Sequence, residues 1–282
     1  MLKRLIILCE NTVEKPVHAI GEHGFSCLVE TDNGVFLFDT GQGLGLLHNA
    51  DLLNISLNSL QGVILSHGHF DHTGGLQQLL SRTGTLPVYG HPDLFRERFW
   101  LGKFEQRPNG IPLSQDQYEK LGACFDLSTM FREISPGLWL TGEIPRQTEF
   151  EKVDKALHYV DPCGVLTQDP LEDDCSLVIE SEYGLVVLLG CAHAGLANIL
   201  HHVTTKMGDD KIYAVLGGMH LAPLNDAQFA QTVAVLKQYK VNKIGVGHCT
   251  GQRRSADLYA HFPAETIFLS VGSVLSISST KQ

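Results

Sequence analysis

Short apolar runs bounded by turn residues recur along this chain, and such runs predict strands rather than helices. Residues 25–30 and 35–39 flank the turn residues 31–34, which predicts a hairpin. Residues 175–180 and 185–189 predict a second hairpin in the same way. Further strands are expected at residues 1–8, 62–66, 86–89, 138–141, 212–216, 243–246 and 266–271, and helices at 75–81, 197–206, 226–239 and 255–262.

Each hairpin is followed by strands that alternate with helices, so the two halves of the chain share the same order of elements. This order predicts an α/β (α+β) fold of four layers, αβ/βα, with two sheets face to face and helices outside. We expect one domain over residues 1–282. Residues of about 93–165 interrupt the order as an insertion that shapes the substrate pocket, and within it residues 93–130 are expected to form helices and a loop.

Composition and charge narrow the function classes. The chain has 282 residues, 18% of them charged, with a net charge of −10 and no basic stripe, so nucleic-acid binding is not expected. Seven scattered cysteines without a CxxC motif are typical of reduced, cytoplasmic proteins. No apolar run approaches the ~18 residues that cross a bilayer, so no membrane partner is expected. The expected partner is a small-molecule substrate, and a homodimer is left open.

The strongest chemical signal is a cluster of ligand-type side chains, His67, His69, Asp71 and His72. The cluster directly follows the apolar run 63–65 and precedes a glycine-rich loop. A strand end followed by a tight loop places the first two histidines on one side and the other two residues on another, which suits two adjacent metal ions better than one. Imidazole and carboxylate are ligands of several transition metals. We expect one or two divalent ions, zinc first, with iron and manganese as alternatives.

Three more histidines follow apolar strands in the second half: His193, His220 and His248. Strand ends are where sites assemble in layered α/β folds. One such histidine would usually be structural, but three of them beside the first cluster favour metal ligation. Cys191 and Cys249 adjoin these histidines, and a small buried cysteine is favoured there over a thiolate ligand.

Other polar residues are candidates for supporting roles. Asp39 ends a strand, where it would orient a ligand histidine or cap the turn. His23 precedes a strand and faces either the site or solvent. Asp173 and Asp174 precede the second hairpin; a metal-binding role is one interpretation, and solvated loop acids are the favoured one.

These residues resemble the metallo-β-lactamase superfamily. The resemblance rests on the strand-end histidines, on the loop 67–72 and on the segment Phe38-Asp39-Thr40-Gly41, and it covers most of the chain. Several stretches are similar to the branch named for 7,8-dihydropterin-6-methyl-4-(β-D-ribofuranosyl)aminobenzene 5′-phosphate synthase. They are residues 22–26, 141–146, 190–195, 217–221 and 247–251. The resemblance implies an αβ/βα metallo-β-lactamase-like sandwich with a metal site on one edge.

The resemblance also implies two ligand sets. One would contain His67, His69 and His193, and the other Asp71, His72 and His248. The superfamily's usual bridging aspartate would lie on a strand end between the last two histidines, where this chain has His220. In a second registration, Asp174 takes the place of the usual histidine and His193 lies near the bridging place. Two arrangements therefore remain open: a symmetric pair of ions, or one tightly held ion together with one loosely held ion.

Two reactions and one binding role fit this ligand set. The first is hydrolysis of a phosphoester or related ester bond by metal-activated water, with Asp71 as a ligand that also orients the nucleophile. The alternative, implied by the branch, is a transferase that condenses a pterin diphosphate with an aryl ribofuranosyl phosphate and releases diphosphate. Arg146 and Arg107 would bind phosphate in either case, although solvated surface charge is the favoured interpretation. The second alternative is a weakly catalytic sensor or binding protein, against which the intact ligand set argues.

Overall fold

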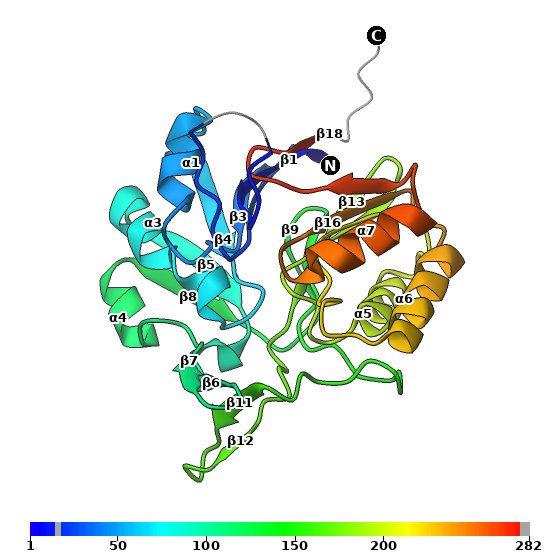
Figure 1. Cartoon of the computed structure of the whole chain (residues 1–282). Coiled ribbons are helices and arrows are strands. Elements are labelled where there is room, and N and C mark those ends of the chain that lie inside the picture. Colours follow the sequence, from blue (N-terminus) through cyan, green and yellow to red (C-terminus); the bar gives the residue numbers. More distant parts are fainter. Residues whose placement is uncertain (15–17, 277–282) are drawn as a thin grey trace.

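The computed structural model describes residues 1–14 and 18–276. Two seven-stranded sheets pack face to face, with helices on both outer surfaces (Figure 1). This arrangement confirms the expected four-layer fold class. Among the described residues, no helix combines the length and the apolar character that a bilayer crossing requires.

The first sheet has the strand order β18-β1-β2-β3-β4-β5-β8. The expected first hairpin forms its centre, and β3 pairs in parallel with β4. The strands are β1 (Leu2–Cys9), β2 (Ser26–Thr31), β3 (Gly34–Phe38), β4 (Leu60–Ile64), β5 (Leu86–Gly90), β8 (Ala123–Leu127) and β18 (Val274–Ser276).

The second sheet has the order β17-β16-β15-β14-β13-β10-β9. Its hairpin β13–β14 is the expected one, and β14, β15 and β16 run parallel. The strands are β9 (Arg132–Ser135), β10 (Leu138–Leu140), β13 (Ser176–Ser181), β14 (Gly184–Leu189), β15 (Ile212–Gly218), β16 (Lys243–Gly247) and β17 (Thr266–Phe268).

Helices cover the outer surface of each sheet. On the first sheet these are α1 (Leu46–Leu52), α3 (Leu76–Thr83) and α4 (Gln115–Lys120). On the second they are α5 (Leu196–Met207), α6 (Asp226–Gln238) and α7 (Gln252–His261). The short helix α2 (Phe70–Thr73) belongs to the candidate site, and the 3-10 turns are η1 (Leu57–Ser59), η2 (Pro92–Phe95) and η3 (His248–Thr250).

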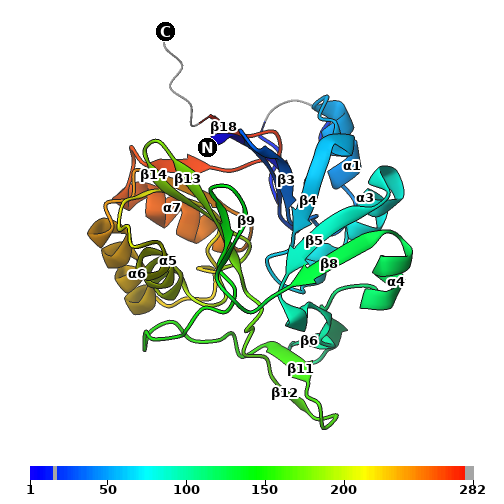
Figure 2. The same cartoon turned by 180° about the vertical axis from the view of Figure 1, so that it is seen from behind.

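The expectation of helices and a loop at residues 93–130 is wrong in part, because the segment also contains strands. Two of them belong to a third sheet of order β12-β11-β6-β7, which lies at one end of the molecule (Figure 2). The pairing of β6 with β11 joins segments that lie far apart in the chain. The strands are β6 (Arg98–Leu101), β7 (Gln106–Pro108), β11 (Leu157–Val160) and β12 (Leu166–Gln168).

Alternating side chains of β3 show how the layers are held together. Phe36 and Phe38 pack between the two sheets, whereas Leu37 packs under the helices of the first sheet. Each fully buried side chain of this kind contributes about 1.5–3 kcal/mol. Parallel strands of both sheets, β3 and β4 in the first and β14, β15 and β16 in the second, end at the same edge. The loops that follow them are not packed between the sheets and can carry polar side chains.

Candidate metal centre

The loop after β4 supplies the first ligand-type residues. His67 lies in the loop and His69 in extended backbone just before α2, whereas Asp71 and His72 lie on α2. The Nε2 atom of His67 lies 2.9 Å from Nδ1 of His69. All four residues are buried.

One side of the cluster consists of His67, His69 and His193, and we call it the three-histidine side. Their ring nitrogens lie within 4.8 Å of one another. The Nε2 atoms of His69 and His193 are buried and have no hydrogen-bond partner. An unsatisfied buried polar atom costs about 1–3 kcal/mol, and three imidazoles are a recognised zinc-binding set. The residues present therefore fit a transition metal ion.

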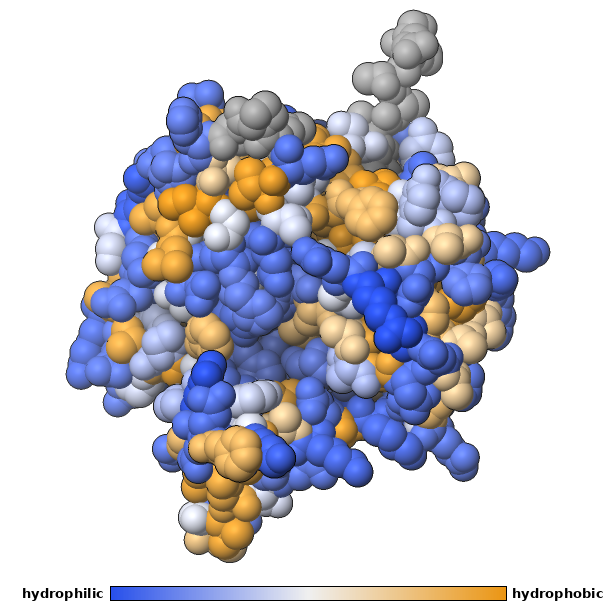
Figure 3. Space-filling model, viewed as in Figure 1, coloured by the Kyte–Doolittle hydropathy of each residue, from blue (hydrophilic) through white to orange (hydrophobic). Residues whose placement is uncertain are grey.

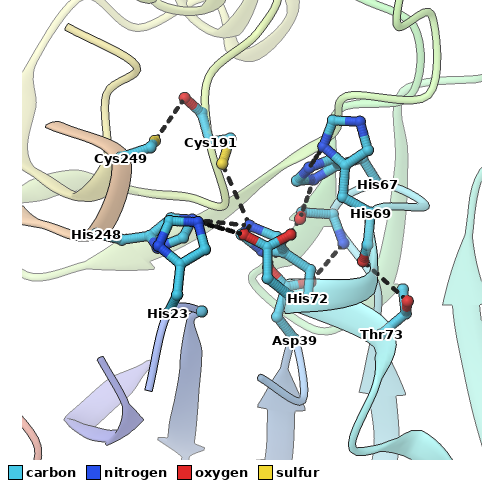
Figure 4. A network of polar contacts seen from close by, with 12 residues as sticks. His23, Asp39, His67, His69, His72, Thr73, Cys191, His248 and Cys249 are labelled. Carbon is cyan, nitrogen blue, oxygen red and sulfur yellow. Dashed lines mark hydrogen bonds and ion pairs between the residues drawn. The ribbon is translucent and has the colours of Figure 1, made fainter. Parts of the chain in front are cut away.

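The other side consists of Asp71, His72, His248 and His23, and we call it the carboxylate side. The Oδ2 atom of Asp71 lies 3.2 Å from Nε2 of His23 and 3.4 Å from Nε2 of His248. The Nε2 atoms of His72 and His248 lie 3.1 Å apart, and the rings point toward one another (Figure 4). His23 is exposed, whereas Asp71, His72 and His248 are buried.

Cys191 lies between the two sides, at the end of β14. Its Sγ atom is 3.2 Å from Nε2 of His72, and it forms a potential ligand group with His72 and His67 (Figure 4). It also forms groups with His193 and His220, and with His248 and Cys249. Among the described residues, Asp71 is the only carboxylate in any of these groups. Cys191 belongs to three of these groups, while the position expected for the bridging carboxylate, between His193 and His248, carries His220.

Outer hydrogen bonds orient the imidazoles so that Nε2 faces the centre. The buried carboxylate of Asp39 accepts from the backbone N–H and the hydroxyl of Ser66, and from Nδ1 of His72, each at 2.7 Å. Nδ1 of His248 lies 3.0 Å from Oδ1 of Asn11. Such partners fix the tautomer and the ring orientation of metal-binding histidines. Asp39 thus contacts a candidate ligand histidine, as one of the two roles considered for it requires. Nothing in the sequence indicated that Asn11 would contact His248.

Four of the residues around the centre adopt positive φ values that side chains normally disfavour. They are Asp39 (58°), Ala192 (60°), His220 (47°) and His248 (48°), and all follow strand ends. Such conformations cost about 1–3 kcal/mol each and tend to cluster at functional sites. The sharp turns direct these strand ends back toward the pocket.

Burial decides the protonation of the three-histidine side. Burial, together with the charge of Arg98 behind the loop, lowers the pKa of His69 to about 3. Burial also lowers the pKa of His67 and of His193 well below the usual value. These rings are neutral near pH 7 and offer lone pairs, which is the metal-binding form.

Neighbouring charges decide the protonation of His72 and Asp71 on the carboxylate side. Burial alone would lower the pKa of His72, but the carboxylates of Asp39 and Asp71 raise it to about 9. Burial alone would raise the pKa of Asp71, but His72 and His23 hold it below its usual value. Asp71 is therefore ionised near pH 7 and is available as an acceptor.

His220 reaches the same cavity, beside His193, with ring centroids 4.4 Å apart. Its Nε2 atom lies 3.4 Å from a carboxylate oxygen of Asp154. Burial would lower the pKa of His220, but the contacts with Asp154 and Cys249 raise it to about 10. His220 thus lies next to the three-histidine side without belonging to it.

Asp173 and Asp174 are not solvated loop acids, so the interpretation favoured in the sequence is wrong. Both are buried, and their carboxylates bond Arg98 and the backbone of Gly68 and Ala194. The Oδ2 atom of Asp174 accepts the backbone N–H of Ala194 at 2.9 Å, and burial raises the pKa of Asp174 to about 6. Neither aspartate joins a ligand group among the described residues.

A pocket of about 550 Å³ opens onto the centre. The small third sheet and its loops contribute Trp100, Arg107, Asn109 and Leu157 to its wall. Figure 3 shows a hydrophilic hollow in the middle of this face and an apolar tip below it. The lining also includes His23, His69, Asp71, His193, His220 and His248.

The two candidate arginines are placed differently. Arg107 lines the pocket, is bonded to Glu105 and lies 5.8 Å from the ring centre of Trp100. Arg146 does not line it and instead donates to the carbonyl oxygens of His193 and Pro170, each at 2.6 Å. Arg146 therefore holds the loop that carries His193.

The family model described as "Metallo-beta-lactamase superfamily" matches residues 20–270, and the chain belongs to this superfamily. The chain is 34% identical, over 88% of its length and 84% of the relative, to the 7,8-dihydropterin-6-methyl-4-(beta-D-ribofuranosyl)-aminobenzene-5'-phosphate synthase of Methanocaldococcus jannaschii. A solved structure described as a metal-dependent hydrolase of the beta-lactamase superfamily is 27% identical, with a TM-score of 0.85, and covers 98% of this chain and 100% of that one. A diphosphatase of the PhnP family, 15% identical with a TM-score of 0.53 over 98% and 97% of the chains, shares the fold.

Proposed function

We propose that the protein is a metal-dependent hydrolase acting on a phosphoester or related ester bond. The observation that carries this proposal is the convergence of His67, His69 and His193 at the pocket, with two buried Nε2 atoms lacking a partner. A bound divalent ion would supply hydroxide at neutral pH and polarise the electrophile.

The protein's own residues would position the reactants. His67, His69 and His193 would hold one ion, while Asp71, His72 and His248 would hold a second. The ionised Asp71 would also accept a hydrogen bond from the attacking water and orient it. Cys191 would be an additional ligand for either ion, since its Sγ atom lies beside both sides.

The insertion at residues 93–165 would supply substrate contacts. Trp100 and Leu157 offer apolar area, and Arg107 offers a cation at the pocket wall. A substrate that combines an aromatic group with a phosphate would match these contacts. We therefore place phosphate recognition at Arg107 rather than at Arg146, whose guanidinium is occupied by carbonyl groups.

The second candidate is the transferase reaction, in which a pterin diphosphate is condensed with an aryl ribofuranosyl phosphate. The specific support is the 34% identity to the synthase over 88% of this chain. The wall containing Trp100 would stack on a flat ring system, and the ion would neutralise the leaving diphosphate.

Metal analysis of the purified protein, coupled to metal-dependent assays, tests both candidates. The panel contains phosphodiesters, phosphomonoesters, lactones, and the pterin diphosphate with its aryl acceptor. Hydrolysis without a pterin supports the first candidate, and diphosphate release that requires both pterin and acceptor supports the second. Binding without turnover on the whole panel supports a binding protein.

The variant His67→Ala should lose metal and turnover together. The matched control His201→Ala removes an exposed imidazole on α5, outside the pocket, and should change neither. A wild-type protein that retains no transition metal after purification and reloading contradicts the metal proposal.

A further inference from the structure

A buried ion triad lies behind the loop that carries His67 and His69. The guanidinium of Arg98 donates to Asp169 at 2.7 Å and to Asp173 at 2.8 Å. All three side chains are 0% exposed. The triad joins β6 of the small sheet to the segment that leads into β13.

The triad is bonded directly to the backbone of the histidine loop. The second carboxylate oxygen of Asp173 accepts the backbone N–H of Gly68 at 2.8 Å. A Cβ atom on Gly68 would lie 2.2 Å from Nη1 of Arg98 and 2.2 Å from the carbonyl oxygen of Leu94. The loop therefore rests against the guanidinium with no space between them, and only glycine fits there.

Two backbone contacts connect the same loop to the small sheet. Phe70 donates its N–H to the carbonyl oxygen of Asn109 at 3.0 Å, and His69 pairs with Gly110 as an isolated bridge. Arg98 and Trp100 are two residues apart on β6 and so share one face of the strand. The sheet that lines the pocket with Trp100 thus holds the histidine loop with Arg98.

Stability alone is a weak reason for such a triad. Replacing a buried ion triad by apolar residues of similar volume is often neutral or stabilising, because desolvation offsets the attraction. What apolar residues cannot reproduce is an acceptor aimed at the N–H of Gly68. The triad therefore fixes the position of the loop that carries His67 and His69.

We propose that Asp173 and Arg98 are positioning residues that set the spacing of His67 and His69, and that the small sheet is coupled to the metal centre through them. This inference rests on the proposed metal-dependent function. Neither residue touches the reacting groups; both act through the backbone of Gly68.

The test compares Asp173→Leu with Asp173→Asn. The amide oxygen of the asparagine variant can still accept the N–H of Gly68, but its NH2 group then faces Arg98 and cannot accept from it; leucine accepts from neither. The control Arg254→Met removes a nearly buried arginine that bonds Asp226 and Asp257 in the other half of the molecule. Zinc competition titration, the visible spectrum of the Co²⁺-loaded protein, and hydrogen–deuterium exchange of residues 66–70 in metal-free protein are measured for each.

We expect Asp173→Leu to lower metal affinity by about 10- to 100-fold, as losing an outer partner of a metal site does. Its Co²⁺ spectrum should shift, and exchange at residues 66–70 should be faster. Asp173→Asn keeps an acceptor for Gly68 but loses the bond to Arg98, so it should change all three measurements less than Asp173→Leu does. Arg254→Met should match the wild type. If Asp173→Leu does not fold, the apolar triad Arg98→Met, Asp169→Leu and Asp173→Leu replaces it.

Unchanged affinity, spectrum and exchange in a folded leucine variant would overturn the inference while leaving the metal function intact. A wild type that binds neither Zn²⁺ nor Co²⁺ contradicts the proposed function instead. In that case, hydrogen–deuterium exchange alone tests whether Asp173 positions the histidine loop. Unchanged exchange at residues 66–70 in metal-free Asp173→Leu would again overturn the positioning role.

Discussion

The three-histidine side and the carboxylate side differ in how well their groups satisfy one another. On the three-histidine side, Nε2 of His69 and of His193 has no partner. On the carboxylate side, Asp71 already contacts His23 and His248. An ion on the first side would satisfy two orphaned atoms and replace the contact between His67 and His69, whereas an ion on the second would only replace existing contacts. On this basis we propose that the three-histidine side holds an ion more tightly than the carboxylate side.

The largest expected effect separates the two sides by their histidines. His193→Ala should lower the affinity for the tight ion by more than ~100-fold. Loss of an outer partner costs up to about 100-fold, and loss of a direct ligand should cost more. His248→Ala should leave one tight ion bound per chain. Metal analysis after dialysis measures both, and equal losses in the two variants would remove the distinction between the sides.

The next prediction concerns Asp174, which supports the loop of the three-histidine side. Burial raises the pKa of Asp174 from 3.8 to about 6, so folding favours its protonated form. This contribution is fully present below pH 4 and is lost as the pH rises through 6. Asp174→Asn should therefore gain stability relative to the wild type between these pH values, by about 3 kcal/mol. Urea unfolding of metal-free protein at pH 4 and pH 7 measures the difference, and a pH-independent difference contradicts it.

Asp39 provides a test of the carboxylate side. Asp39→Asn removes a charge that orients His72 and holds Ser66, so metal affinity should fall by about 10- to 100-fold. The loss should appear mainly in the loosely bound ion, because His72 belongs to the carboxylate side. Stepwise zinc titration resolves the two sites, and an effect confined to the tight site would place His72 with the three-histidine side.

The smallest effect is expected at the pocket wall. Arg107 is exposed, so Arg107→Gln should raise KM for a phosphate-bearing substrate by no more than about fivefold, which corresponds to ~1 kcal/mol. Metal content should not change, because Arg107 contacts neither side. Arg253→Gln removes an equally exposed arginine outside the pocket and is the matched control. An equal KM change in both variants would remove Arg107 from substrate recognition.

Elements with a strong local pattern were predictable from the sequence. The hairpins β2–β3 and β13–β14 appear where alternating apolar runs flank turn residues. The strands β6, β8 and β11 were missed, because each is stabilised by a partner distant in the sequence rather than by its own pattern. The same limit led to the wrong interpretation of Asp173 as solvated.

By itself the sequence determined the local part of the centre. His67, His69, Asp71 and His72 lie within six residues after a buried strand, so chain connectivity alone keeps them together. The sequence also determined the family, since motifs spread over most of the chain carry it.

Only the tertiary structure decided which distant groups complete the centre. Cys191 lies between the two sides, Asn11 meets His248 across the fold, and Asp173 holds Gly68 from beneath. The structure also placed Arg146 on backbone carbonyls instead of in the pocket. The physical reason is that these contacts depend on how two sheets and an insertion pack, and packing brings together residues whose separation along the chain carries no signal.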